Sequence, residues 1–186
     1  HNYPLVKIGT QYWMRDNLEA SSYVGGEALP RLDAVTANVV GYLQSATEHY
    51  FYTANVVLSN KILPAHWSIP DWKDWNILKD YLNGEASLLK SGTWLPLKAG
   101  EQVQPATNLS GFNGIPVGMY VGAFQTDYEK KHLAYWTLDN ANAAIDIKVF
   151  YLKSGVWMKG IWTLMKSVWY QPLYIVDKIN ANYIKK

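Results

Sequence analysis

Side chains able to perform catalysis are few and scattered along this chain of 186 residues. Cysteine is absent, which excludes thiol nucleophiles, thiolate zinc sites and disulfides, and no Gly-x-Ser-x-Gly sequence supports a serine nucleophile. His49 and His132 have no ligating neighbour at helical spacing and are expected to be solvated. His66 adjoins Trp67 and is expected to pack or to form a hydrogen bond. The sequence therefore predicts no catalytic residue and no enzyme.

Tryptophan and tyrosine are unusually frequent, with nine Trp and 14 Tyr against four Phe. An exposed aromatic face can pack against a sugar ring while nearby Asn and Asp side chains bind the hydroxyls. The candidate ligand-binding residues are Trp72, Trp157, Trp162, Asp139 and Asn140. The pair Asp139-Asn140 is equally typical of a turn between strands, so that interpretation stays open.

The segment 156–170 allows three interpretations. Trp157, Trp162 and Trp169 could lie on the outer side of a hairpin and bind a ligand, or they could cover a sheet. An amphipathic helix at a membrane surface is the third interpretation, but Gly160 and the Val, Ile and Trp content favour strands.

The clearest predicted element is a helix within residues 71–84. Asp71 is expected to be its N-cap, and Asp74 completes a capping box three residues later. Capping accounts for both carboxylates, which could otherwise be paired as a general acid and base. Trp72 lies off the apolar face and is expected to be exposed, and Asn-Gly at 83–84 is a left-handed stop signal. The apolar face comprises Trp75, Leu78 and Leu82.

The other predicted elements are short. Residues 3–14 are expected to form a hairpin that turns at 9–10, and 50–53 a strand that leads into a brief helix ending at Asn60. Residues 32–44 could be helix or strand. Frequent Gly, Pro and Asn exclude long helices beyond residue 92, and alternating runs predict antiparallel strands at 117–121, 134–138, 144–152 and 173–179. Helices early and strands late predict an α+β fold in a single domain over 1–186.

Overall charge and hydropathy exclude some partners. There are 17 Lys and Arg against 15 Asp and Glu, and this net charge of +2 predicts no nucleic-acid partner. No run of about 18 uncharged apolar residues occurs, so no transmembrane helix is predicted. The chain begins at His1 with no signal sequence, so we expect a mature form or a fragment.

Five ordered sequence blocks resemble those of a bacterial family. They are IGTQYWMRDNL (8–18), PAHWSIPDWKDWNILKDYLNG (64–84), LLKSGTW (88–94), ATNLSGFNGIPVGMY (106–120) and AYW (134–136). Over about residues 6–176 the chain resembles the Fibrobacter succinogenes major paralogous domain. That family is similar to C-type lectin-like domains, which implies two helices packed on antiparallel sheets, paired terminal strands and a long loop region.

The resemblance also implies structural roles. Tryptophans within the blocks are expected in the core: Trp13, Trp67, Trp75 and Trp136. Many family members carry a cysteine pair where this chain has Leu63 and Ile175, so we expect these two side chains to touch in place of a disulfide. Residues 27–49 and 178–186 fit no family block and are expected to be an insertion and a C-terminal extension.

Sugar-binding C-type lectins often hold calcium through carboxylates and amides of the long loop, and calcium prefers such oxygen ligands. The acidic and amide residues available downstream are Asp127, Glu129, Asp139, Asn140, Asn142 and Asp146. The triplets Glu-Pro-Asn and Gln-Pro-Asp are absent. The sequence therefore predicts no metal or cofactor, with calcium as the alternative.

The resemblance implies a non-catalytic adhesion or recognition domain of a secreted or surface bacterial protein, located outside the cell, whose partner is a glycan or a surface protein. The alternative is a structural or assembly module of a surface appendage. A polysaccharide hydrolase is a third class, which requires two carboxylates roughly 5 to 10 Å apart in a cleft. A concave polar site beside an exposed aromatic side chain favours recognition, whereas a flat apolar patch above roughly 600 Å² favours the structural module.

Overall fold

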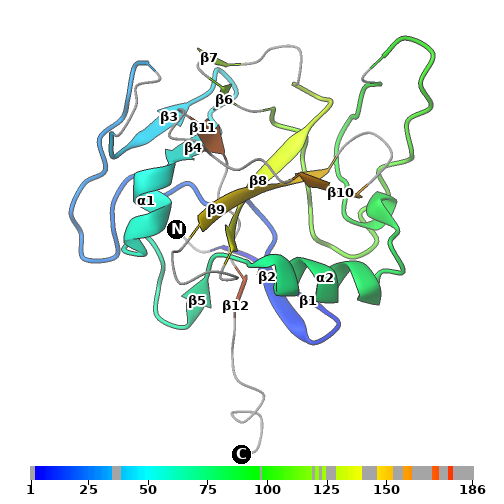
Figure 1. Cartoon of the computed structure of the whole chain (residues 1–186), viewed down its shortest axis with the longest axis horizontal. Helices are drawn as coiled ribbons and strands as arrows, with labels where there is room; N and C mark the ends of the chain where they lie inside the picture. The colour runs from blue at the N-terminus through cyan, green and yellow to red at the C-terminus, as the bar shows by residue number, and fades with distance from the viewer. Residues whose placement is uncertain are drawn as a thin grey trace, which may run out of the picture.

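The structure is a computed structural model of the whole chain (Figure 1). It describes the side chains of residues 3–34, 39–96, 98–118 and 129–138. It describes the backbone alone for residues 120–121, 123–124, 139, 146–152, 157–160, 169–171 and 176–177. The expected contact between Leu63 and Ile175 lies outside this range, because Ile175 is not among the described residues.

Two short α-helices and a set of short strands make up the described part of the chain. The helices are α1 (Ala54–Ser59) and α2 (Trp72–Tyr81), followed by a 3-10 turn at Ala86–Leu88. The strands are β1 (Leu5–Ile8), β2 (Gln11–Met14), β3 (Tyr42–Gln44), β4 (Tyr50–Thr53), β5 (Trp67–Ser68), β6 (Tyr120–Val121), β7 (Ala123–Phe124), β8 (Leu133–Asp139), β9 (Asp146–Leu152), β10 (Trp157–Gly160), β11 (Trp169–Gln171) and β12 (Val176–Asp177). The prediction of an α+β fold is confirmed.

The strands form three antiparallel sheets. Their orders are β1-β2-β12-β5, β10-β9-β8 and β3-β4-β11-β6-β7. Figure 1 shows β8 and β9 across the middle of the molecule, with α2 below them. The predicted N-terminal hairpin is confirmed as β1 and β2, and its turn contains Gly9 at φ +61°. Strand β12 pairs with β2, so the terminal strands lie together as the resemblance implied.

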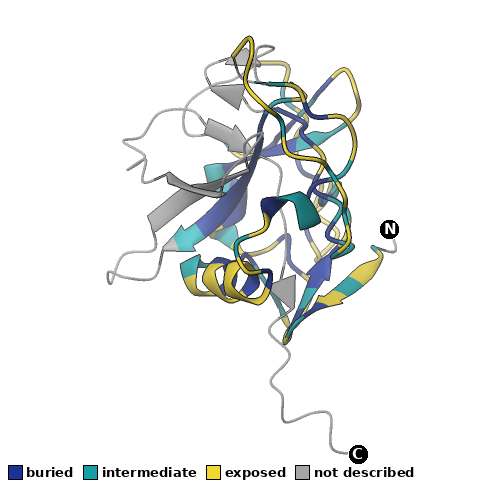
Figure 2. Cartoon of the chain, turned by 90° about the vertical axis from the view of Figure 1, so that its right-hand side faces the viewer, coloured by how far each residue is buried: buried dark blue, intermediate teal, exposed yellow. Residues whose placement is uncertain are grey.

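Helix α2 begins and ends as its sequence predicts. The Asp71 carboxylate accepts a hydrogen bond of 3.0 Å from the Asp74 N–H, and Oδ2 of Asp74 accepts one of 2.9 Å from the Asp71 N–H. Asn83 (φ +51°) and Gly84 (φ +76°) follow the last turn in left-handed conformations. Trp75 and Leu78 are buried, and the outer face of the helix is exposed (Figure 2).

Strand β8 separates two hydrophobic clusters, because successive side chains of a strand point to opposite faces. Leu133 and Tyr135 belong to the first core cluster, whereas Ala134 and Trp136 belong to the second. All four are fully buried, so β8 is covered on both sides. In β4 the same alternation places Phe51 in the first cluster and Tyr52 in the second.

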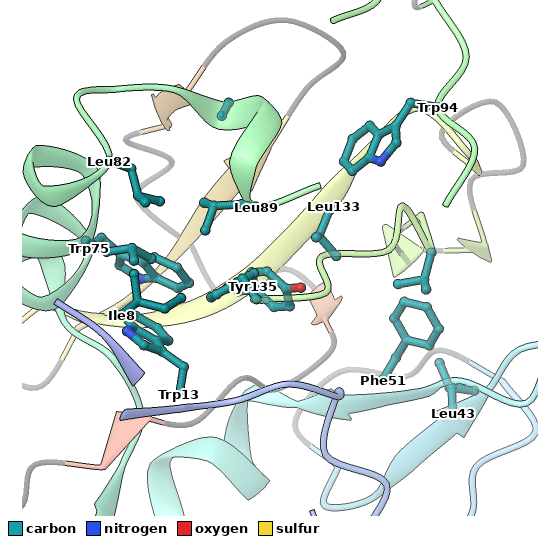
Figure 3. Close-up of a cluster of buried hydrophobic side chains, with 14 residues drawn as sticks. Ile8, Trp13, Leu43, Phe51, Trp75, Leu82, Leu89, Trp94, Leu133 and Tyr135 are labelled. Carbon is teal, nitrogen blue, oxygen red and sulfur yellow. The ribbon is translucent and has the colours of Figure 1, made fainter. Parts of the chain in front are cut away.

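Aromatic rings dominate the first cluster (Figure 3). The ring centroid of Trp75 lies 4.9 Å from that of Trp13 and 5.9 Å from that of Tyr135. Nε1 of Trp75 donates a hydrogen bond of 2.9 Å to Oγ1 of Thr137. Trp13, Trp75 and Trp136 are therefore core residues, as expected, while Trp67 is only half-buried against the second cluster.

The expectations for two histidines need correction, and two segments are described only in part. His132 is 5% exposed and not solvated, because it directly precedes the doubly covered strand β8. His66 is exposed at φ +74°, which contradicts the packed position that was one of its two expected roles. Within 156–170 the described strand β10 pairs with β9, whereas β11 pairs with β4 and β6, and residues 161–168 lie outside the described residues. Of residues 32–34 and 39–44, which the structure describes, Tyr42–Gln44 form the strand β3.

Candidate functional site

A polar pocket of about 280 Å³ opens where three loops meet. One loop follows β2, the second is the turn between β3 and β4, and the third precedes β6. The residues that line it are Tyr3, Asp16, Asn17, Glu19, His49, Asn113 and Ile115. Two carboxylates, two carboxamides, an imidazole and a phenol thus surround one cavity, so we take this polar pocket as the candidate site.

The segment after β2 supplies three of the lining residues. Leu18, in the middle of this segment, is 3% exposed and belongs to the second core cluster, which turns its polar neighbours away from the core. The Glu19 N–H donates a hydrogen bond of 3.0 Å to the Tyr3 hydroxyl. The Ala20 N–H donates one of 2.7 Å to the Tyr52 hydroxyl. Side chains therefore hold the backbone of this loop, which has no helix or strand partner of its own.

Asp16 and Asn113 join opposite walls of the polar pocket. Nδ2 of Asn113 donates a hydrogen bond of 2.9 Å to Oδ1 of Asp16. The backbone N–H of Asn113 donates one of 2.7 Å to Oδ1 of Asn108, which fixes Asn113 in its left-handed conformation at φ +62°. A charged acceptor makes the bond to Asp16 stronger than one between neutral groups. The pair therefore places a carboxylate and a carboxamide side by side.

Glu19 and His49 form a second pair on the wall. Nδ1 of His49 lies 3.6 Å from Oε1 of Glu19, and the two side chains are 26% and 43% exposed. The His49 backbone N–H donates a hydrogen bond to Oγ of Ser45, which anchors the turn that carries the imidazole. Burial raises the pKa of Tyr3, so its hydroxyl stays neutral and can both donate and accept near neutral pH.

The polar pocket offers paired acceptors and donors and carries negative charge. Asp16 and Glu19 contribute two carboxylates, and no Lys or Arg is among the described residues that line the cavity. Adjacent hydroxyls of a polyol can donate to a carboxylate and accept from a carboxamide at the same time. Over the described residues, no group of three or more His, Cys, Asp or Glu side chains is arranged to hold a metal ion.

Of the predicted ligand-binding residues, only Trp72 has a described side chain, and it does not line the polar pocket. Trp72 is half-buried against the first core cluster and is not the exposed platform that was expected. Trp157 lies in β10 and Asp139 at the end of β8, opposite Asp146 of β9, and only their backbones are described. Trp162 and Asn140 lie outside the described residues. Among the residues lining the polar pocket, none was predicted.

A sequence signal for the polar pocket was nevertheless present. Asp16-Asn17 and Asn113 lie within two of the five ordered family blocks, at 8–18 and 106–120. Polar residues inside such a block, beyond the end of a predicted hairpin and outside any predicted helix, have no packing or capping role to explain them. A search for such residues would have selected Asp16 and Asn113.

Lys90 is a second residue that the sequence analysis missed. Its side chain is completely buried, and its Nζ lies 4.8 Å from the centroid of the Trp94 ring. Burial lowers the pKa of Lys90 to about 8. Trp94 is itself fixed by a hydrogen bond of 2.9 Å from its Nε1 to the Ser91 carbonyl.

The described residues thus define an α+β domain with antiparallel sheets and a loop-built polar pocket on its surface. The chain belongs to the Fibrobacter succinogenes major domain family, whose model matches residues 6–182. No curated protein and no solved structure matches the chain. No helix of the described residues is long and apolar enough to cross a membrane.

Proposed function

We propose that this chain is a non-catalytic recognition domain of a secreted or surface-exposed bacterial protein, and that it binds a glycan in the polar pocket. The observation that carries the proposal is the bond between Asp16 and Asn113 at the wall of a 280 Å³ cavity. A fixed carboxylate beside a fixed carboxamide matches the paired donors and acceptors of neighbouring sugar hydroxyls. Tyr3 adds an aromatic side chain at the same cavity.

A C-type lectin-like fold is part of this proposal. It is supported by the pairing of β12 with β2, by the two helices, and by the long loop region between α2 and β8. The concave, polar character of the site favours recognition over the structural module, which calls for a flat apolar surface.

The test is a glycan array probed with the labelled domain, once with calcium and once with a chelator. Array hits are then titrated against the parent and against Asp16→Ala and Asn113→Ala. Asp80→Ala is the matched control, because Asp80 is an exposed carboxylate on α2, away from the polar pocket. We expect binding that falls at least ten-fold in both pocket variants and is unchanged in the control.

Four other outcomes would redirect the assignment. Binding that persists in Asp16→Ala and Asn113→Ala would place the ligand elsewhere on the domain. Binding that disappears only in chelator would indicate calcium at the site. Absence of binding on the whole array would favour the structural or assembly module, and release of shorter sugars from a bound oligosaccharide would favour the hydrolase.

A further inference from the structure

Tyr52 connects the core to the acidic wall of the polar pocket. Its side chain is fully buried in the second core cluster, beside Val56 and Trp136. Nε1 of Trp136 donates a hydrogen bond of 3.0 Å to the Tyr52 carbonyl, which ties its backbone to strand β8. The ring and the backbone of Tyr52 are thus both fixed by the most buried part of the molecule.

The hydroxyl of Tyr52 ends among backbone groups of the loop that lines the cavity. It accepts a hydrogen bond of 2.7 Å from the Ala20 N–H. Its single O–H lies within hydrogen-bond distance of two carbonyl oxygens, that of Leu18 at 3.1 Å and that of Ala20 at 3.0 Å, and donates to one or is shared between them. A single buried hydroxyl therefore serves backbone groups on both sides of Glu19.

We propose that Tyr52 is a positioning residue for ligand binding in the polar pocket, because its hydroxyl fixes the 18–20 backbone from which the Glu19 carboxylate extends. The part of this inference that concerns ligand binding rests on the proposed function. Tyr52 is fully buried and does not line the cavity, so it acts only through the loop.

Two features make this role specific to Tyr52. The segment 18–20 lies outside the helices and strands of the described residues, and the N–H groups of Glu19 and Ala20 donate to the hydroxyls of Tyr3 and Tyr52. Burial raises the pKa of Tyr52, which keeps the hydroxyl protonated and able to donate and accept at once. Phenylalanine fills the same space but leaves the Ala20 N–H without this acceptor.

The test compares Tyr52→Phe with Thr137→Val. Thr137 is a buried residue of β8 whose hydroxyl accepts from Trp75 in the first core cluster, so its loss weakens the core away from the loop. Hydrogen exchange of single amides and binding on an array of neutral oligosaccharides are measured for both variants. We expect Tyr52→Phe to speed exchange of the Ala20 amide at least ten-fold and to reduce the array signal at least ten-fold. Thr137→Val is expected to lower thermal stability without either effect.

The result separates the two proposals. Unchanged exchange at Ala20 in Tyr52→Phe, or an array signal that falls equally in Thr137→Val, would overturn the positioning role. A parent that binds no oligosaccharide would overturn the proposed function, while the exchange arm still decides whether Tyr52 fixes the loop. If Tyr52→Phe does not fold, hydrogen exchange of the parent protein alone tests the inference. The Ala20 amide of the parent must then be as protected from exchange as the amides of β8. An unprotected Ala20 amide would contradict the inference.

Discussion

Nδ2 of Asn113 donates a hydrogen bond of 2.9 Å to the carboxylate of Asp16, although the two residues are 97 positions apart in the sequence. The bond joins the loop after β2 to the loop before β6 and makes both of them walls of one polar pocket. The same hydrogen bond thus holds two distant loops of the fold together and shapes the proposed site.

Asn113→Ala should weaken both the domain and its ligand binding. Removal of a partly exposed hydrogen bond to a carboxylate is expected to lower the free energy of unfolding by about 1 kcal/mol. Urea denaturation measures this change, with Asn76→Ala as the control because Asn76 is exposed on α2. Equal stability of parent and Asn113→Ala would mean that the bond to Asp16 contributes nothing to holding the loops.

The charge of the polar pocket should select among glycans. Asp16 and Glu19 repel uronic and sialic acids, so neutral oligosaccharides are expected to give the stronger array signal. Glu19→Gln removes one carboxylate at nearly constant shape and should raise the signal of acidic glycans by about three- to ten-fold, since one unit charge at about 4 Å contributes about 1 kcal/mol in water. This gain should shrink in high salt. A parent that prefers acidic glycans would contradict the expectation.

Lys90→Met should stabilise the domain at pH 7, and the gain should disappear in alkali. The pKa of Lys90 is about 8 in the folded protein and near 10.5 when unfolded, so between these pH values the unfolded chain binds more protons and the parent gains stability as pH rises. Below pH 8 the destabilisation that accompanies the lowered pKa of Lys90 is fully present, at about 1 to 3 kcal/mol.

Denaturation of parent and Lys90→Met at pH 7, 8.5 and 10 measures this difference. It should be largest at pH 7 and fall to roughly a quarter of that value by pH 10, where the unfolded lysine is still mostly protonated. Lys79→Met, on the exposed face of α2, serves as the control for the substitution itself. A Lys90→Met variant less stable than the parent at pH 7 would show that the buried ammonium is a net stabilising group.

Asp71→Ala should remove half of the capping box of α2. The Asp74 N–H then loses its acceptor, and the free energy of unfolding is expected to fall by about 1 kcal/mol. Asp80→Ala changes the charge of the same helix near its other end and should cost less, because acidic residues favour helix N-termini. Equal loss in the two variants would indicate that net charge, and not capping, sets the effect. Thermal unfolding followed by circular dichroism measures both.

Local sequence determined the elements whose signals act within about four residues. The capping box of Asp71 and Asp74, the left-handed stop at Asn83, and the turn at Gly9 each rest on hydrogen bonds or backbone conformations of near neighbours. The ordered blocks likewise identified the family over most of the chain. These features depend on local interactions and not on the elements that pack against them.

The burial of Trp72 is a packing relationship that the local pattern does not predict. Trp72 lies off the apolar stripe of α2, yet it is half-buried against the first core cluster. The strands β10 and β11, close in sequence, joined different sheets instead of each other. Strand β10 pairs with β9, 5 to 11 positions away, whereas β11 pairs with β4, 117 to 119 positions away, and no local pattern records that distant partner.

The polar pocket itself was decided by tertiary structure alone. Its walls come from Tyr3, the loop at 16–19, His49 and the loop at 113–115. The sequence marks Asp16, Asn17 and Asn113 as polar residues within the family blocks, but it does not show that they share a cavity. The burial of Lys90 and His132 depends in the same way on strands and loops that close over them from elsewhere in the chain. The sequence therefore determined the elements, their caps and the family, whereas only long-range packing decided which side chains share a cavity, because burial is a property of neighbours that are distant along the chain.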